Sequence, residues 1–394
     1  MLNFNYYTPT KIIFGKDTEK TVGKEIHDLG YKKVLVHYGS GKRLQESGLL
    51  DNVHKSLTEY GVGYVDLGGV VPNPRMSLVK QGIELCKRES VDFILAIGGG
   101  SPIDSAKAIG YGLANSDVDL VDVYMARVTV DKCYPIGCIL TIAAAGSEMS
   151  NSSVITIEEG QRKRFYDHDS SRPKFSILNP EMTYTLPAYQ TASGAVDIMM
   201  HTMERYFTTV KDVVLIDRMA EGLLVSVKEA AVAAVKNPYD YEARATLMWG
   251  GSLSHNGLLG TGRVGAFGPH MIEHEVSGMF DVTHGAGLSA VWSSWARYVY
   301  KTNVGRFARF AVEVFGVKQN YENLEETALA GISAWEDWCH SINMPVSLSE
   351  LGVHPTDEQI VDMAKKATFD DAITIDGFQP LTSSDVVAIL TAAK

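Results

Sequence analysis

Two kinds of segment take turns in the first half of the chain: short apolar runs, and longer stretches in which apolar residues recur with helical spacing. Short runs rich in β-branched residues recur at residues 33–38, 91–97, 135–141, 154–157 and 174–178. Between the early runs, residues 76–89 and 102–113 show the 3.6-residue spacing of amphipathic helices. This strand–helix alternation is typical of a parallel sheet covered by helices on both faces, so we predict an α/β domain.

The pattern changes near residues 180–187, where prolines interrupt the chain. From residue 188 onward the spacing is almost wholly helical, as in residues 188–207, 217–235 and 306–315. At 394 residues the chain is too long for one ordinary core and suits two domains. We therefore predict an α/β domain over residues 1–184 and an all-helical domain over residues 185–394.

Composition narrows the class of protein. Hydrophobic residues make up 45% and charged residues 21%, as in a globular protein, and the net charge is −11. That charge argues against nucleic acid or an anionic membrane as a partner. No run of roughly 18 apolar residues and no signal peptide is read, and the four cysteines are expected to be reduced. We expect a cytoplasmic protein.

A glycine cluster follows the apolar run that ends at residue 97. Gly98, Gly99 and Gly100 would let the backbone approach a pyrophosphate closely. Ser101 is predicted as the N-cap and Pro102 as the first residue of the next helix, which would aim amide donors at the phosphates. A tight turn without a ligand is the alternative for this motif taken alone.

Two further segments favour a nucleotide. Residues 141–148 end a run in small and hydroxyl-bearing residues, which suits contact with a flat cofactor. The loop of residues 39–43 contains Ser40, Lys42 and Arg43 and no acid. An enzyme that prefers NAD usually offers an acid to the ribose, whereas NADP needs donors or cations for its 2′-phosphate. The loop indicates NADP, and a solvated basic turn is the alternative.

Candidate metal ligands begin at Asp197 and His201. They are four residues apart in the segment 188–207, so both side chains lie on one face of the predicted helix. Such a pair can bind one cation, although it can equally be an ordinary ion pair.

A second group of candidates follows. His270 and His274 repeat the same spacing, and His284 stands before a glycine. A carboxylate with several imidazoles is typical of a divalent site of the Zn²⁺ or Fe²⁺ type. Spacing alone leaves open whether His270, His274 or both bind metal. His255 is a further candidate that we assign to structural hydrogen bonding.

The combined motifs resemble the iron-containing, or group III, alcohol dehydrogenase family, in particular its NADPH-dependent butanol dehydrogenase and aldehyde reductase branch. The resemblance runs nearly from end to end. Its motifs are Thr10–Gly15, Gly68–Pro74, Gly98–Asp104, Ala145–Glu148, Arg172–Pro180, Asp197-x3-His201, Gly268-x-His270-x3-His274 and Asp281-x2-His284-Gly285.

The resemblance implies roles residue by residue. The family's metal ligands correspond to Asp197, His201, His270 and His284, and its further active-site histidine to His274. Its cofactor contacts correspond to Gly39, Ser40, Gly98, Gly99, Gly100, Ser101, Asp104, Thr141, Ser147 and Lys163. It also implies a dehydroquinate synthase-like architecture, in which a Rossmann-like, dinucleotide-binding α/β domain precedes an all-helical metal-binding domain, with the site in the cleft between them. A homodimer is implied as well.

The predicted function is hydride transfer between NADP(H) and a primary alcohol or aldehyde, assisted by Fe²⁺, with Zn²⁺ as the other metal considered. His274 is the predicted proton relay. An NAD- and Zn²⁺-dependent glycerol or polyol dehydrogenase is the nearest alternative, and the basic loop at residues 40–43 weighs against it. A dehydroquinate synthase-like lyase would need more cations near the metal, and a non-catalytic nucleotide sensor would need no metal ligands.

Overall fold

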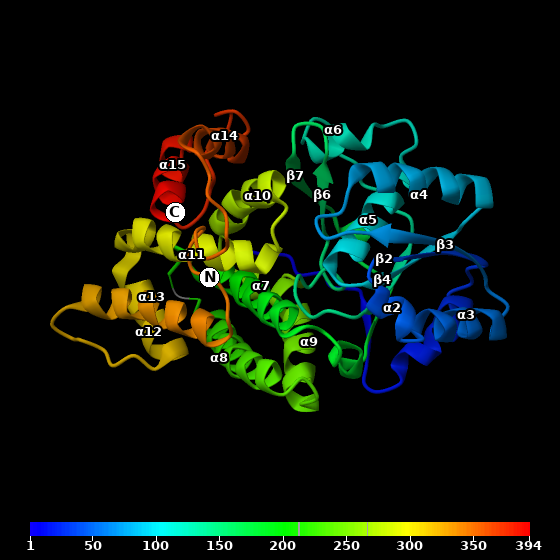
Figure 1. Cartoon of the computed structure of the whole chain (residues 1–394), viewed down its shortest axis with the longest axis horizontal. Coiled ribbons are helices and arrows are strands. Elements are labelled where there is room, and N and C mark those ends of the chain that lie inside the picture. Colours follow the sequence, from blue (N-terminus) through cyan, green and yellow to red (C-terminus); the bar gives the residue numbers. More distant parts are fainter. Residues whose placement is uncertain (212, 266) are drawn as a thin grey trace. The chain divides into compact units, whose positions relative to one another are not determined.

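The computed structural model describes residues 1–211, 213–265 and 267–394. The chain divides into two compact units. One consists of Tyr7–Leu186, and the other joins Met1–Tyr6 to Pro187–Lys394. Figure 1 labels the main helices and strands of each unit. The first is called the sheet unit below and the second the helical unit.

A six-stranded, all-parallel sheet forms the centre of the sheet unit, as the strand–helix alternation predicted. Its order is β1-β8-β5-β4-β2-β3. The strands are β1 (Lys11–Phe14), β2 (Lys33–Gly39), β3 (Gly63–Val70), β4 (Phe93–Gly98), β5 (Ile136–Leu140) and β8 (Phe175–Leu178). A separate antiparallel pair is formed by β6 (Ser152–Ile157) and β7 (Arg162–Asp167).

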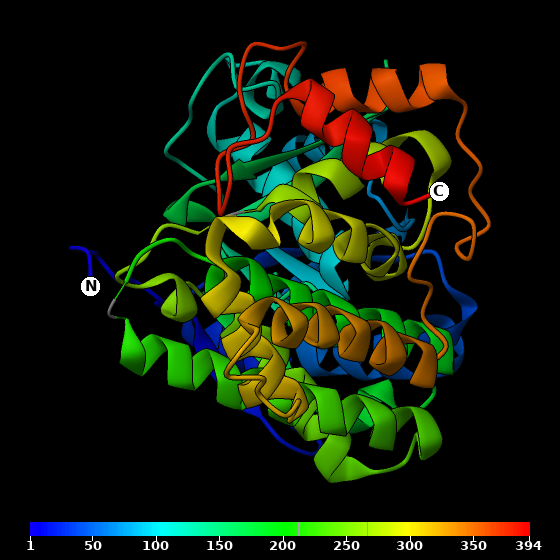
Figure 2. The same cartoon turned by 90° about the vertical axis from the view of Figure 1, so that its left-hand side faces the viewer.

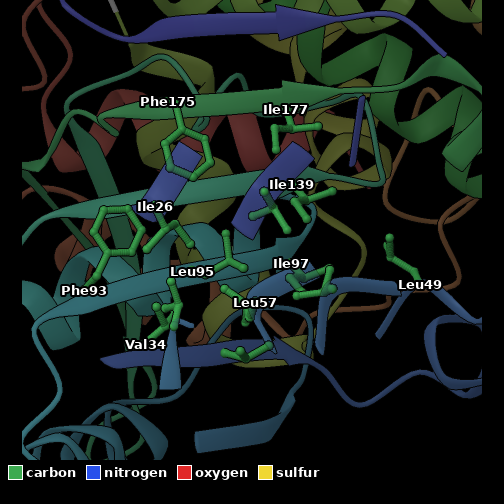
Figure 3. Close-up of a cluster of buried hydrophobic side chains, with 14 of the residues drawn as sticks. Ile26, Val34, Leu49, Leu57, Phe93, Leu95, Ile97, Ile139, Phe175 and Ile177 are labelled. Atoms are coloured by element: carbon green, nitrogen blue, oxygen red, sulfur yellow. The ribbon is translucent and has the colours of Figure 1, made fainter. Parts of the chain in front are cut away.

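Alternate residues of the strands build the two faces of this sheet. Val34, Phe93, Leu95 and Ile139 belong to a buried apolar cluster with side chains from α1 (Val22–Asp28) and α3 (Leu49–Glu59), shown in Figure 3. The intervening residues, such as His37, face α5 (Gly100–Ala114), because the imidazole of His37 contacts Ser105. Both faces are therefore covered, and the strands read as continuous apolar runs.

The order in which the chain adds strands to the sheet reverses between the neighbouring parallel strands β2 and β4. The chain leaves β2 for β3 on one side and leaves β4 for β5 on the other. Ligands of open α/β sheets bind at such a switch point, beyond the carboxyl ends of the strands. Gly39 and Gly98 end these two strands, so the loops after them lie at that point.

The helical unit contains nine helices among its described residues. They are α7 (Ala188–Tyr206), α8 (Val214–Lys236), α9 (Tyr241–His255), α10 (Gly268–Phe280), α11 (His284–Val299), α12 (Val304–Phe315), α13 (Leu324–Ser341), α14 (Asp357–Ala367) and α15 (Ser383–Ala392). Figure 2 shows them in green to red, and their core holds the rings of Phe207, Trp292, Phe307 and Phe310. Across the described residues, no helix has the length and apolar character needed to cross a membrane.

Candidate metal centre and nucleotide-binding edge

Helix α7 carries the first two predicted ligands into the interior of the helical unit. Asp197 and His201 are one turn apart and both are buried. Three guanidinium groups bind carbonyls near the end of this helix. Arg205 donates to His201 O, Arg263 to Arg205 O, and Arg306 to Tyr206 O. Cations are favourable at a helix C-terminus, so they help to fix α7 and its two ligands.

Three imidazoles converge on one carboxylate oxygen. Asp197 Oδ1 lies 3.3 Å from His201 Nδ1, 3.7 Å from His270 Nε2 and 3.8 Å from His284 Nε2. His270 is in the first turn of α10, and His284 is the first residue of α11. The structure thus brings all four predicted ligands together from three helices.

Three of these atoms lack hydrogen-bond partners. Within the described residues, Asp197 Oδ1, His201 Nδ1 and His270 Nε2 are buried and have no hydrogen-bond partner. Each buried polar atom left in this state costs roughly 1–3 kcal/mol. One ligand atom from each of these residues lies within 4.8 Å of the others. A carboxylate oxygen with imidazole nitrogens at this spacing fits a divalent cation of the Fe²⁺ or Zn²⁺ type.

Charge states differ between the histidines. Burial, together with the neighbouring histidines and Arg205, lowers the pKa of His201 well below its ordinary value, so its ring stays neutral. Burial also acts to lower the pKa of His270, but the charge of Glu204, the hydrogen bond to Glu204 and the nearby carboxylate of Asp197 outweigh it and raise that pKa to about 9. A cation binding at His270 therefore displaces a proton.

Sequence reasoning missed Glu204, which lies beside the cluster. It is on α7, seven residues after Asp197 and three after His201, so it shares their helix face. Its Oε1 lies 2.5 Å from His270 Nδ1. The i, i+4, i+7 spacing of Asp, His and Glu was the available signal.

His274 lies next to the cluster of Asp197, His201 and His270 but is not part of it. It is buried on α10, one turn after His270, and its ring centroid lies 5.7 Å from that of His284. Glu273, His274 and His284 also bring ligand atoms within 4.8 Å of one another. However, His284 Nδ1 already donates to Glu273 Oε2, so this carboxylate has a hydrogen-bonding role.

His255 packs beside the cluster, as does Phe267. The ring of His255 meets that of His201 edge-on at a centroid distance of 4.1 Å. Arg205 lies over the Phe267 ring at 4.8 Å, and its Nη2 lies 3.4 Å from His255 Nδ1. These contacts give one side of the cluster an aromatic and cationic wall.

The glycine turn at the end of β4 allows no side chain. A Cβ at Gly98 would lie 2.5 Å from Pro102 Cγ, and one at Gly100 would lie 2.9 Å from Ala145 Cβ. The predicted N-cap at Ser101 is wrong, because α5 begins at Gly100 and its N-cap is Gly99. The helix therefore starts earlier than predicted, and the first-turn amides without a partner inside the helix are those of Gly99, Gly100 and Ser101, since Pro102 has no N–H.

Asp104 and Ser147 hold a loop together. Asp104 Oδ1 accepts from Ser147 Oγ at 2.5 Å and Oδ2 from Val154 N at 3.0 Å. The fully buried ammonium of Lys107 donates to oxygens of residues 147–152, at distances of 2.7–3.3 Å. Burial raises the pKa of Asp104 to about 6, against the opposing charge of Lys107. Sequence reasoning missed Lys107, although it is one turn after Asp104.

The remaining predicted cofactor residues divide between two places. Gly39 ends β2, Ser40 follows it, and Thr141 follows β5, so they lie at the carboxyl edge of the sheet with Gly98–Ser101. Lys163 is buried on β7 in the antiparallel pair. Arg43 turns inward, where its guanidinium donates to Met182 O at 3.1 Å, whereas Ser40 and Lys42 are exposed.

Known proteins match over the whole chain. Residues 9–180 match the family described as iron-containing alcohol dehydrogenase, and residues 191–394 match the C-terminal part of the Fe-containing alcohol dehydrogenase family. The NADH-dependent butanol dehydrogenase A of Clostridium acetobutylicum is 38% identical over 99% of both chains. The NADPH-dependent aldehyde reductase YqhD of Escherichia coli is 32% identical over 90% of both.

A solved structure shares the fold. The NADH-dependent butanol dehydrogenase A of Thermotoga maritima superimposes with a TM-score of 0.94 at 36% identity, covering 100% of this chain and 99% of its own. These matches define an NAD(P)-dependent alcohol or aldehyde dehydrogenase of the iron type, resembling the butanol dehydrogenases. The chain belongs to the iron-containing alcohol dehydrogenase family, as its sequence motifs predicted.

Proposed function

We propose that this enzyme reduces primary aldehydes with NADPH, and oxidises the alcohols in reverse, with Fe²⁺ held by Asp197, His201, His270 and His284. The observation that carries the proposal is the buried, unpartnered group of Asp197 Oδ1, His201 Nδ1 and His270 Nε2, with His284 Nε2 3.8 Å from the same carboxylate oxygen. Relatives named as butanol dehydrogenases and as an aldehyde reductase support the substrate class.

The proposed cofactor contacts follow the carboxyl edge of the sheet. The free amides of the glycine run and the dipole of α5 favour a pyrophosphate. Gly39 and Ser40 would contact the adenosine end. The full set is Gly39, Ser40, Gly98, Gly99, Gly100, Ser101, Asp104, Thr141, Ser147 and Lys163. Asp104 and Lys107 would act there by fixing the loop that carries Ser147.

The residues of the chain divide the chemical work. A bound divalent cation supplies Lewis acidity toward the substrate oxygen, and the nicotinamide supplies or accepts the hydride. Asp197 would contribute one negative charge and the neutral histidines none, so a bound divalent cation would keep a net positive charge of one and remain electrophilic. His274, buried one turn from His270, is the proposed relay for the substrate proton.

NADPH use is proposed from the loop after β2. Ser40 and Lys42 are exposed, and no residue from 39 to 43 is acidic. A 2′-phosphate gains from such donors and cations, whereas a bare ribose gains from an acid. Ser40→Asp should therefore lower kcat/KM for NADPH and raise it for NADH, while Lys55→Ala, at an exposed lysine of α3, should change neither. Equal or greater activity of the unaltered enzyme with NADH would contradict this preference.

The test of the activity starts from metal-stripped protein. Reconstitution with Fe²⁺ or Zn²⁺ separately, followed by NADPH oxidation with butanal, should restore turnover only with metal. Asp197→Ala should abolish both metal retention and turnover. Absence of turnover with either metal and either cofactor would refute the proposal, and glycerol with NAD would be assayed next.

A homodimer is proposed for the same enzyme. Strand β1 is at the edge of the six-stranded sheet, and Phe14 at its end is 40% exposed. Edge strands offer backbone groups to a second chain. Light scattering during size-exclusion chromatography should give twice the chain mass, and a single-chain mass would contradict the assignment.

A further inference from the structure

Glu204 caps a helix other than its own. The N-cap of α10, Phe267, makes no side-chain cap, so the first-turn amides of α10 need acceptors from elsewhere. Glu204 Oε1 lies 3.1 Å from His270 N and 2.5 Å from His270 Nδ1. One oxygen of α7 therefore accepts from both the backbone and the ring of His270, and it fixes the position of this side chain relative to α7.

Glu273 holds the next histidine in the same way. This carboxylate is fully buried on α10 and accepts from His284 Nδ1, at the first residue of α11. Ser277 donates to its other oxygen. Gly287 leaves room for it, since a Cβ there would lie 2.6 Å from Glu273 Oε1. The carboxylate of Glu273 therefore fits in the space left by Gly287 and accepts hydrogen bonds from both Ser277 and His284.

The two carboxylates join the ligand-bearing helices in series. Glu204 of α7 binds His270 of α10, and Glu273 of α10 binds His284 of α11. Because each carboxylate can only accept while ionised, each ring donates through Nδ1–H and turns Nε2 toward Asp197 Oδ1. A carboxylate behind a ligating histidine fixes its tautomer and orientation and makes it a stronger ligand.

We propose that Glu204 and Glu273 are positioning residues of the metal centre, which aim the Nε2 atoms of His270 and His284 at the cation. The proposal rests on the metal function proposed above. Within the described part of the chain, His201 has no carboxylate of this kind; its ring is flanked by His255 and Arg205. Two of the three imidazoles are thus oriented before the cation binds.

Glu221 of α8 provides a matched control. It is as buried as the two positioning residues, and it accepts from Tyr206 Oη at 2.9 Å and from Arg309 Nε at 2.6 Å. Among the described residues its hydrogen-bond partners are Tyr206, Arg218 and Arg309, and none of them is a histidine. Loss of its charge should disturb packing in the helical unit without changing the orientation of any ligand.

The experiment measures metal binding by full-length, metal-free protein with Co²⁺ and Fe²⁺ alone. Glu204→Gln and Glu273→Gln should each weaken binding, measured by chelator competition, by about 10–100-fold. The visible ligand-field bands of bound Co²⁺ should shift in both variants. Glu221→Gln should lower the melting temperature of the metal-free protein yet keep the dissociation constant within about twofold.

Three outcomes overturn the inference. The first is an unchanged Co²⁺ affinity and spectrum in both glutamate variants. If Asp197→Ala then still abolished binding, the metal centre itself would be upheld. A loss of affinity equal to that of Glu221→Gln would show that the carboxylates only support the fold. If the unaltered protein binds neither metal, the proposed function itself fails.

Discussion

The buried imidazole of His37 predicts that the sheet unit loses stability in mild acid. His37 is fully buried on β2 between Leu67 O and Ser105 Oγ, each at 2.8 Å from a ring nitrogen. A carbonyl can only accept, so Nδ1–H donates to Leu67 and Nε2 accepts from the Ser105 hydroxyl. Burial lowers the pKa of His37 to about 4, although the hydrogen bond to Leu67 acts in the opposite direction.

The magnitude follows from the two pKa values. An unfolded histidine titrates near 6.5, so above that pH neither state binds the proton. As the pH falls from about 6.5 to 4, the unfolded chain takes up a proton that the native chain refuses, and the free energy of unfolding decreases. The full loss is about 3 kcal/mol, of which about 2 kcal/mol is reached between pH 7.5 and pH 5.

His37→Gln isolates this contribution, because an amide can donate and accept but does not titrate. All five tryptophans belong to the helical unit, so the sheet unit is followed by hydrogen exchange of the β2 and β4 segments in increasing urea. The free-energy difference between the two proteins should change by about 2 kcal/mol from pH 7.5 to pH 5. A difference that stays constant within about 0.5 kcal/mol would refute the reasoning.

Three further predictions concern the turn, the metal and the buried lysine. Gly100→Ala places a methyl group 2.9 Å from Ala145 Cβ, so calorimetry should show about tenfold weaker NADPH binding with metal content unchanged; undiminished affinity would count against the turn as a phosphate site. Fe²⁺ at a hundred times its dissociation constant should stabilise the helical unit by about 2.7 kcal/mol, read by tryptophan fluorescence, and an unmoved transition would argue against binding there. Lys107→Met leaves the oxygens of residues 147–152 without their donor and should destabilise the sheet unit by about 3–5 kcal/mol in the urea assay; a loss below about 1 kcal/mol would contradict its role.

Periodicity explains which parts of the fold were predictable. The buried strands β2, β4 and β5 are mostly apolar runs, and they were predicted within a residue or two of their ends. Strand β3 was missed, because it is at the sheet edge, contains three glycines and buries only Val70 fully, so it is not an apolar run. The start of α5 was placed too late, since serine is the usual N-cap and only the packing around Gly98 and Gly100 excludes it.

The metal centre shows a similar limit. Spacing of four residues identified Asp197 with His201, because one helix carries both. It could not separate His270 from His274, which share a face of α10; the distance from Asp197 Oδ1 to His270 Nε2 distinguishes them. Glu204 contacts His270 on a different helix, and such a tertiary contact is not recorded in any local sequence pattern.

The small size of Gly287 limits which residue can stand at position 273 of the neighbouring helix. A Cβ at position 287 would lie 2.6 Å from Glu273 Oε1, so the two positions constrain each other across neighbouring helices. Gly287→Ala in the presence of Glu273 would displace the carboxylate and break its hydrogen bond with His284. A shorter residue at position 273 would instead leave room for a methyl group at position 287. The glutamate at position 273 and the glycine at position 287 are therefore coupled sterically, so substitutions at the two positions should not have additive effects on stability.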